Sequence, residues 1–167
     1  MAVLVRAITY AALFIGFVLV FLPARVLRWS GIAGAPPGGL PGAAGVAVAA
    51  VGAALAVWCV LTFALVGKGT PAPFDPPRRL VARGPYRVVR NPMYVGAGLA
   101  LAGASLVYRS VALLAFTVGF LLVCHVFVLA YEEPTLRRTF GAEYAGYCSR
   151  VRRWWPRLRS WRAARDG

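Results

Sequence analysis

The sequence changes character within residues 84–98, which read GPYRVVRNPMYVGAG. The segment begins with turn-forming and cationic residues, reaches Pro92, and continues with small apolar residues. Proline suits the first position of a helix, because its φ angle is preset and it lacks an amide hydrogen that would have no partner there. We therefore expect a helix to begin at about Pro92, with the polar corner Arg90-Asn91 directly before it.

The composition indicates that this helix lies in a membrane. The 167 residues are 60% hydrophobic and their mean hydropathy is +0.68, which is too apolar for an ordinary soluble domain. Apolar stretches occur at residues 7–27, 43–67, 93–107 and 111–131. A helix needs about 20 residues to cross a hydrocarbon core of about 30 Å, and only the third stretch is clearly short. We predict an all-α polytopic membrane protein with about four transmembrane helices.

The first apolar stretch could instead be a cleaved signal peptide, because Arg6 precedes it. However, the first Ala-x-Ala sequence, at residues 33–35, lies well beyond the stretch and is followed by two prolines. That is a poor context for cleavage. An uncleaved span is the favoured interpretation.

The basic residues are sorted along the chain. The net charge is +14, and sixteen of the 19 Lys and Arg residues are Arg6 or fall in residues 68–90 and 137–165. The other segments between apolar stretches hold only Arg25, Arg28 and Arg109. Cationic loops remain on the cytoplasmic side. We therefore expect both termini to be cytoplasmic.

The C-terminal tail mixes arginine with tryptophan, in the sequence RVRRWWPRLRSWRAAR at residues 150–165. Such a segment could bind single-stranded nucleic acid, but next to a membrane span it more often anchors to lipid headgroups. We expect an interfacial anchor and no nucleic-acid partner. Cys59, Cys124 and Cys148 show no pairing or metal-ligand spacing, so we expect free thiols and no metal site.

The third apolar stretch carries small residues at helical spacing. Gly96, Ala100 and Ala104 form one ridge, and small faces let membrane helices approach closely. Because only three residues separate this stretch from the next, we expect residues 93–131 to form a tightly packed hairpin. As a helix, the third apolar stretch would be only about 22 Å long. If it crosses the membrane, the Arg90-Asn91 corner lies below the headgroups, in protein or in a wet cavity.

Two adjacent carboxylates, Glu132 and Glu133, lie where the fourth stretch ends. Pro134 follows them and should kink the helix, because it cannot donate to the carbonyl of Ala130. The glutamates could simply pair with Arg137 or Arg138 on an exposed helix face. We favour a functional role, because the chain has only five acidic residues and charges at a membrane boundary are candidates for function.

The chain divides into three parts by these criteria. Residues 1–67 form an N-terminal pair of transmembrane helices, residues 68–156 form a loop and hairpin core, and residues 157–167 form a basic interfacial tail. His125 lies seven residues before Glu132 and two turns deeper on the same helix face. A histidine at such a depth needs a partner, which can be another helix or a ligand.

The C-terminal half resembles the isoprenylcysteine carboxyl methyltransferase and phospholipid methyltransferase group. The resemblance covers about residues 67–156, and the ordered combination of motifs is more specific than any one of them. The motifs are Gly84-Pro85-Tyr86, Arg90-Asn91-Pro92-Met93-Tyr94, Gly96-x-Gly98, His125, Glu132-Glu133, Phe140-Gly141, Tyr144, Tyr147 and Arg153-Trp154 through Pro156.

The resemblance implies an integral membrane methyltransferase that uses S-adenosylmethionine, with the core at residues 68–156 binding it from the cytosolic side. It implies catalytic roles for Arg90, Asn91 and Glu133. The cofactor-binding residues that it implies are Tyr86, Arg90, Asn91, Tyr94, Gly96, Gly98, His125, Glu132, Glu133, Tyr144 and Tyr147. The two glycines on their own would equally indicate helix packing.

One departure from the family concerns Asn91, where the family often has histidine. Asparagine keeps hydrogen-bond donors and an acceptor but does not titrate near neutral pH. A role in proton transfer at this position is therefore in doubt. Arg90 is well suited to a cofactor carboxylate, which a guanidinium binds as a two-pronged fork.

Several functions remain open from the sequence. We expect methyl transfer to a lipophilic acceptor in the bilayer, and a carboxylate acceptor is favoured because it needs no general base. The alternatives are a phospholipid amine N-methyltransferase and a non-catalytic helical membrane protein in which the charges only hold helices together. A membrane reductase with a similar C-terminal hairpin is more distant.

Overall fold

The structure is a computed structural model, and it describes residues 9, 13, 15–32, 38–67 and 79–157. Several sequence features lie outside these residues: Arg6, the Ala-x-Ala sequence, the loop at 68–78 and the tail from residue 158. Within the described ranges the regular elements are all helical, as predicted. They are η1 (Ile15–Phe21), α2 (Leu22–Trp29), α3 (Leu40–Thr62), η2 (Phe63–Gly67), η3 (Gly84–Arg87), α4 (Pro92–Tyr108), α5 (Val111–Phe127), η4 (Val128–Glu132) and α6 (Glu133–Arg150).

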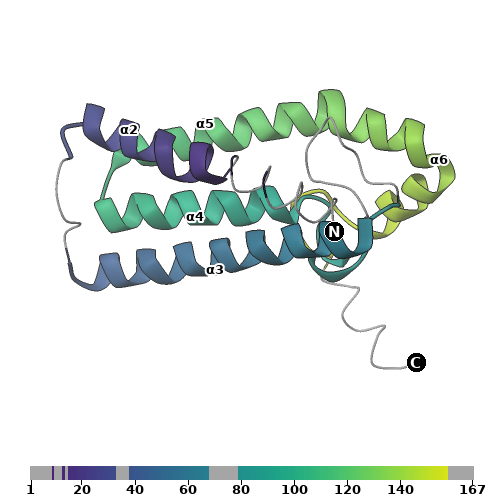
Figure 1. Cartoon of the computed structure of the whole chain (residues 1–167), viewed down its shortest axis with the longest axis horizontal. Helices are drawn as coiled ribbons and strands as arrows, with labels where there is room; N and C mark the ends of the chain where they lie inside the picture. Colours follow the sequence, from purple (N-terminus) through teal and green to yellow (C-terminus); the bar gives the residue numbers. More distant parts are fainter. Residues whose placement is uncertain (1–8, 10–12, 14, 33–37, 68–78, 158–167) are drawn as a thin grey trace.

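The long helices lie side by side, and the chain folds back over one end of them (Figure 1). Helix α4 lies between α3 and α5, while α2 lies against α5. Helix α5 continues through η4 into α6, which turns back at the end of the bundle where α4 begins. This end brings together the start of α4, the start of α6 and the segment after α6.

Helix α4 begins at Pro92, which confirms the predicted start. It ends at Arg109, which adopts the left-handed conformation with φ 47°. The next residue, Ser110, caps α5 by accepting a hydrogen bond from the amide of Leu113 at 3.2 Å. The tight turn therefore places α4 and α5 next to each other, because the left-handed residue ends one helix and the serine satisfies an amide of the next.

The small ridge of α4 that contains Gly96 faces α3, whereas the predicted hairpin with α5 uses another face of α4. A Cβ added at Gly96 would lie 2.8 Å from the carbonyl oxygen of Gly52, and one added at Gly45 would lie 2.7 Å from that of Gly103. Side chains at these positions would overlap backbone, which explains why glycine lines both helices. The closest helix contact is therefore between α3 and α4.

Helices α4 and α5 meet along a different face of α4. A Cβ added at Gly98 would lie 2.8 Å from a methyl group of Leu121. Further along, the hydroxyl groups of Ser105 and Thr117 lie 3.5 Å apart in a buried position. The two glycines, which are separated by one residue, therefore pack against different helices: Gly96 against α3 and Gly98 against α5.

The helical run from α5 to α6 is irregular in two places. Directly before Pro134 the chain forms the π-helical turn η4, in which the amide of Glu133 bonds to the carbonyl of Val128. The sequence predicted an irregularity at this proline, and the wider turn is how the chain accommodates it. The second irregularity is at Gly141, where φ 48° and ψ −120° bend α6 through a conformation that favours glycine.

This is a membrane protein, and its exposed surface is rich in large apolar side chains. By length and composition, two helical segments could each cross a membrane, namely residues 40–62 and the run from 111 to 150. Helix α4 is apolar but has only 17 residues. Part of the first apolar stretch lies outside the described residues. Its described part is helical and belongs to η1 and α2. Four spans therefore remain a prediction.

Candidate active site

The segment after α6 crosses the start of α4 and pairs with it. We call residues 151–155 the C-terminal strap. Arg90 donates its amide to the carbonyl of Arg152 at 2.9 Å, and Asn91 donates its amide to the carbonyl of Arg153 at 3.3 Å. The side-chain amide of Asn91 also donates to Arg153 O, at 3.4 Å. The polar corner predicted from the sequence is therefore bound to residues about 60 positions later in the chain.

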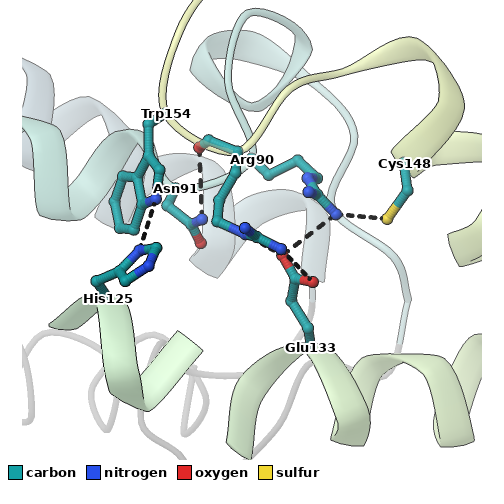
Figure 2. A network of polar contacts seen from close by, with 7 residues as sticks. Arg90, Asn91, His125, Glu133, Cys148 and Trp154 are labelled. Carbon is teal, nitrogen blue, oxygen red and sulfur yellow. Dashed lines mark hydrogen bonds and ion pairs between the residues drawn. The ribbon is translucent and has the colours of Figure 1, made fainter. Parts of the chain in front are cut away.

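Glu133 is the centre of an ion cluster (Figure 2). Arg153 binds it with two hydrogen bonds, Nε to Oε1 at 2.7 Å and Nη2 to Oε2 at 2.9 Å. Arg90 Nη1 lies 3.3 Å from the same Oε1. The side chains of Arg90 and Glu133 are only 12% and 9% exposed, and Arg153 is 28% exposed. Glu133 therefore joins the strap, the loop before α4 and the start of α6.

The cluster carries more positive than negative charge. Glu133 is a single carboxylate held by two guanidinium groups, and its hydrogen bond raises the pKa of Arg153 although partial burial opposes this. Arg90 also donates to the sulfur of Cys148, while its buried Nε has no hydrogen-bond partner among the described residues. A buried cationic donor without a partner is costly. The cluster is therefore chemically suited to a further anion.

Glu132 faces a different partner from its neighbour. One of its carboxylate oxygens accepts a hydrogen bond from the hydroxyl of Tyr94 at 3.2 Å. Successive residues of a helix point in different directions, so the two glutamates reach two sides of the same region. The adjacent carboxylates thus have separate environments, one with arginines and one with a tyrosine.

These groups surround a cavity of about 410 Å³, including the open space at its mouth. Seven predicted cofactor residues line it: Tyr86, Arg90, Asn91, Glu132, Glu133, Tyr144 and Tyr147. The hydroxyl of Tyr147 donates to the carbonyl of Tyr86 at 2.7 Å. That bond ties α6 to the loop before α4 and leaves the rings of Tyr144 and Tyr147, 6.1 Å apart, as neighbouring aromatic surfaces.

The structure places the other predicted cofactor residues beside the cavity or away from it. Tyr94 reaches the region only through Glu132, and Gly96 and Gly98 lie in the helix interfaces with α3 and α5. Nδ1 of His125 accepts a hydrogen bond from the indole Nε1 of Trp154 at 3.1 Å. These four residues do not line the described cavity.

Sequence reasoning did not assign site roles to several residues that the structure brings here. Phe63, Leu80, Val81 and Leu136 form apolar parts of the cavity wall, and no pattern distinguished them from other apolar positions. Arg153 and Trp154 were assigned to the basic tail as membrane anchors, but they contact Glu133 and His125. The resemblance in the segment Arg153-Trp154 was the available indication that these residues differ from their neighbours.

One of three comparisons with known proteins found a match. A model of the phospholipid methyltransferase family matches residues 41–143, which run from α3 into α6 and make up more than half of the chain. Comparisons with curated proteins and with solved structures each gave no match. The chain therefore belongs to the phospholipid methyltransferase family, and membrane methyl transfer is the activity that this membership implies.

Proposed function

We propose that this chain transfers a methyl group from S-adenosylmethionine to a lipophilic acceptor at the membrane. The observation that carries the proposal is the Arg90–Glu133–Arg153 cluster, in which Arg90 and Glu133 line a cavity that also has aromatic and apolar walls. The family match supports the reaction class. The exposed apolar surface of the helices supports an acceptor that partitions into lipid.

The residues present fit this cofactor. S-adenosylmethionine has a carboxylate, an ammonium, a ribose diol and an aromatic base. The cluster has one cation in excess and an unpartnered buried donor on Arg90, which suit the carboxylate. Glu132 and Glu133 can accept from the ammonium or the ribose hydroxyls, and the rings of Tyr144 and Tyr147 can lie against the cationic part or the base.

The protein's contribution to the reaction is positioning and the exclusion of water. The cofactor, when bound, supplies an electrophilic methyl group on its sulfonium. Arg90 would orient the carboxylate end, while Arg153 on the strap holds Glu133 in place at the cavity wall. Holding two reactants in line and away from water provides a large part of the rate enhancement in such transfers.

For the acceptor we propose a carboxylate, which would become a methyl ester. A carboxylate is already deprotonated and needs no general base. The chain's single histidine is engaged by Trp154 instead of lining the cavity. The acceptor would reach the cavity from the lipid, past the apolar side chains of Phe63 and Leu136.

A second candidate acceptor is the amine of a phospholipid headgroup. Such an amine must lose a proton before it can attack. Glu132 supports this candidate, because it lines the cavity and its carboxylate is held by Tyr94 instead of an arginine. The description of the family also favours it.

The orientation in the membrane belongs to the same proposal. With both termini in the cytoplasm, the end of the bundle that holds the cavity faces the cytosol, where the cofactor is made. The exposed cations Arg83, Arg87, Arg137, Arg138 and Arg152 lie at this end, as the positive-inside rule requires.

The proposal is tested by titrating the purified full-length chain in detergent with S-adenosylmethionine. We expect saturable binding that S-adenosylhomocysteine displaces and a nicotinamide nucleotide does not. Membranes that contain the chain should then move label from methyl-labelled cofactor into a lipid extract, and membranes that lack it should not. Absence of saturable binding by folded protein would refute the proposal, and displacement by the nicotinamide nucleotide would favour a reductase.

A further inference from the structure

His125 is bound to the C-terminal strap. Trp154, near the end of the strap, donates its indole Nε1 to Nδ1 of His125 at 3.1 Å, and the two ring centroids are 5.8 Å apart. Figure 2 shows the two rings meeting beside Asn91 and apart from the pair of Arg90 and Glu133. Trp154 is half-buried, whereas the next residue, Trp155, is 76% exposed. The two adjacent tryptophans therefore have different surroundings.

The direction of Trp154 is linked to that of Arg153. The strap leaves α6 at Val151, with φ −117° and ψ 128°, and its adjacent residues Arg153 and Trp154 contact different helices. Trp154 points towards His125 on α5 and lies 6.5 Å from the ring of Tyr94 on α4. Arg153 points towards Glu133 on α6. Fixing the indole thus holds the adjacent Arg153 within reach of Glu133.

Few other contacts hold the strap. Backbone hydrogen bonds join it to Arg90 and Asn91 through two carbonyl groups, those of Arg152 and Arg153. The remaining hydrogen bonds from its side chains are those of Arg153 and Trp154. An indole has a single donor, so the bond to His125 uses all of the hydrogen-bonding capacity of Trp154. Its loss would remove one of the strap's main attachments among the described residues.

We propose that His125 and Trp154 are a positioning pair, which latches the C-terminal strap to α5 and so sets Arg153 against Glu133. His125 acts through Trp154, and it does not contact the bound small molecule. Glu133 lines the cavity and Arg153 holds both of its carboxylate oxygens, so loss of the His125–Trp154 bond should disturb a carboxylate that faces the bound molecule. The identity of this molecule rests on the proposed function, but the latch itself does not.

Cys148 provides a readout of the latch that does not depend on activity. Its sulfur contacts Arg90, and the residue packs in a cluster with Tyr144, Tyr147 and Val151, the first residue of the strap. Opening of the strap should therefore uncover this thiol. Cys59 and Cys124 are buried within the helices, at 0% and 6% exposure, so peptide mass spectrometry can follow the alkylation of Cys148 separately.

The experiment compares His125→Phe and Trp154→Phe, which remove the acceptor and the donor while keeping a ring, with Trp155→Phe as the matched control on the exposed neighbour. The full-length chain in detergent is treated with an alkylating reagent. Both latch variants should increase the alkylation rate of Cys148 about three- to tenfold, the effect of one hydrogen bond. The double variant should add little to either single change, and His125→Asn, which retains an acceptor, should restore most of the protection.

The same variants should release bound S-adenosylhomocysteine faster by a similar factor, with KM affected more than kcat. Rates of Cys148 alkylation equal to those of Trp155→Phe in both latch variants would overturn the latch. Because Trp154→Phe lies outside the apolar helices, it tests the proposal even where His125→Phe fails to fold. A chain with the expected alkylation rates but no binding of S-adenosylhomocysteine would retain the latch and refute the proposed function.

Discussion

Arg153 reaches back 20 residues along the chain to hold both carboxylate oxygens of Glu133. Arg90 approaches the same carboxylate from the loop before α4. One glutamate thus ties three separate segments together, and removal of either guanidinium leaves the other pair in place. In the proposed function, the two arginines form a joint site for an anionic group.

The first prediction concerns these arginines. Arg153→Ala and Arg90→Ala should each weaken the binding of S-adenosylmethionine by about 1.5 to 3 kcal/mol, the range for hydrogen bonds to charged groups. Glu133→Gln should weaken it comparably, because the two guanidinium groups lose the carboxylate that aligns them. Isothermal titration of folded protein in detergent measures the change.

The control for the first prediction is Arg152→Ala. The side chain of Arg152 is exposed, and the residue contributes to the strap through its carbonyl group, which alanine retains. Its affinity should match that of the unmodified chain. If Arg153→Ala binds as tightly as Arg152→Ala, the cluster only holds the fold together.

The second prediction concerns the interface between α3 and α4. Gly52→Ala places a methyl group about 2.5 Å from the carbonyl oxygen of Gly96, and the helices must separate to admit it. We expect a loss of about 1 to 3 kcal/mol in stability, as for other overpacked sites. Gly119→Ala is the control, because a Cβ there meets nothing within 4 Å. Thermal unfolding in detergent should show a lower midpoint for Gly52→Ala only.

Local features of the helices were predictable from the sequence. The start of α4 at Pro92 follows from the chemistry of proline, and the irregularity before Pro134 follows from its missing amide. The helix that packs on the glycine ridge was not predictable. Gly45 and Gly52 allow α3 to approach it closely, but the short turn after α4 made α5 the expected partner. Spacing identifies a ridge that permits close contact, but it does not identify the helix that takes it.

The candidate site was predictable where residues share a motif, as Arg90, Asn91 and the two glutamates do. The strap was not, because apart from the family resemblance nothing in this run of arginines and tryptophans shows that Arg153 pairs with Glu133. His125 was identified as needing a partner, which it has. The partner is a protein side chain, and a sequence alone cannot choose between that and a ligand.

The third prediction concerns orientation. Cys148 lies in α6, at the end of the bundle with the cavity, and we expect that end to face the cytoplasm. A membrane-impermeant thiol reagent should label it only after the membrane is opened. The latch variant Trp154→Phe should strengthen the signal from opened membranes. Labelling of Cys148 on intact cells would show that the protein has the opposite orientation.

The last prediction concerns the acceptor. Label transferred from methyl-labelled S-adenosylmethionine to lipid should be released as volatile methanol by mild alkali, because esters hydrolyse under these conditions whereas N-methyl groups do not. The expectation rests on a cavity whose described lining contains no histidine and on an acceptor that needs no base. Label that remains on a phospholipid headgroup through alkali would contradict the ester and favour the amine. In that case Glu132→Gln should lower kcat by about 10²- to 10⁴-fold, the contribution of a general base, while Tyr94→Phe, which removes only the hydroxyl that holds Glu132, should lower it much less.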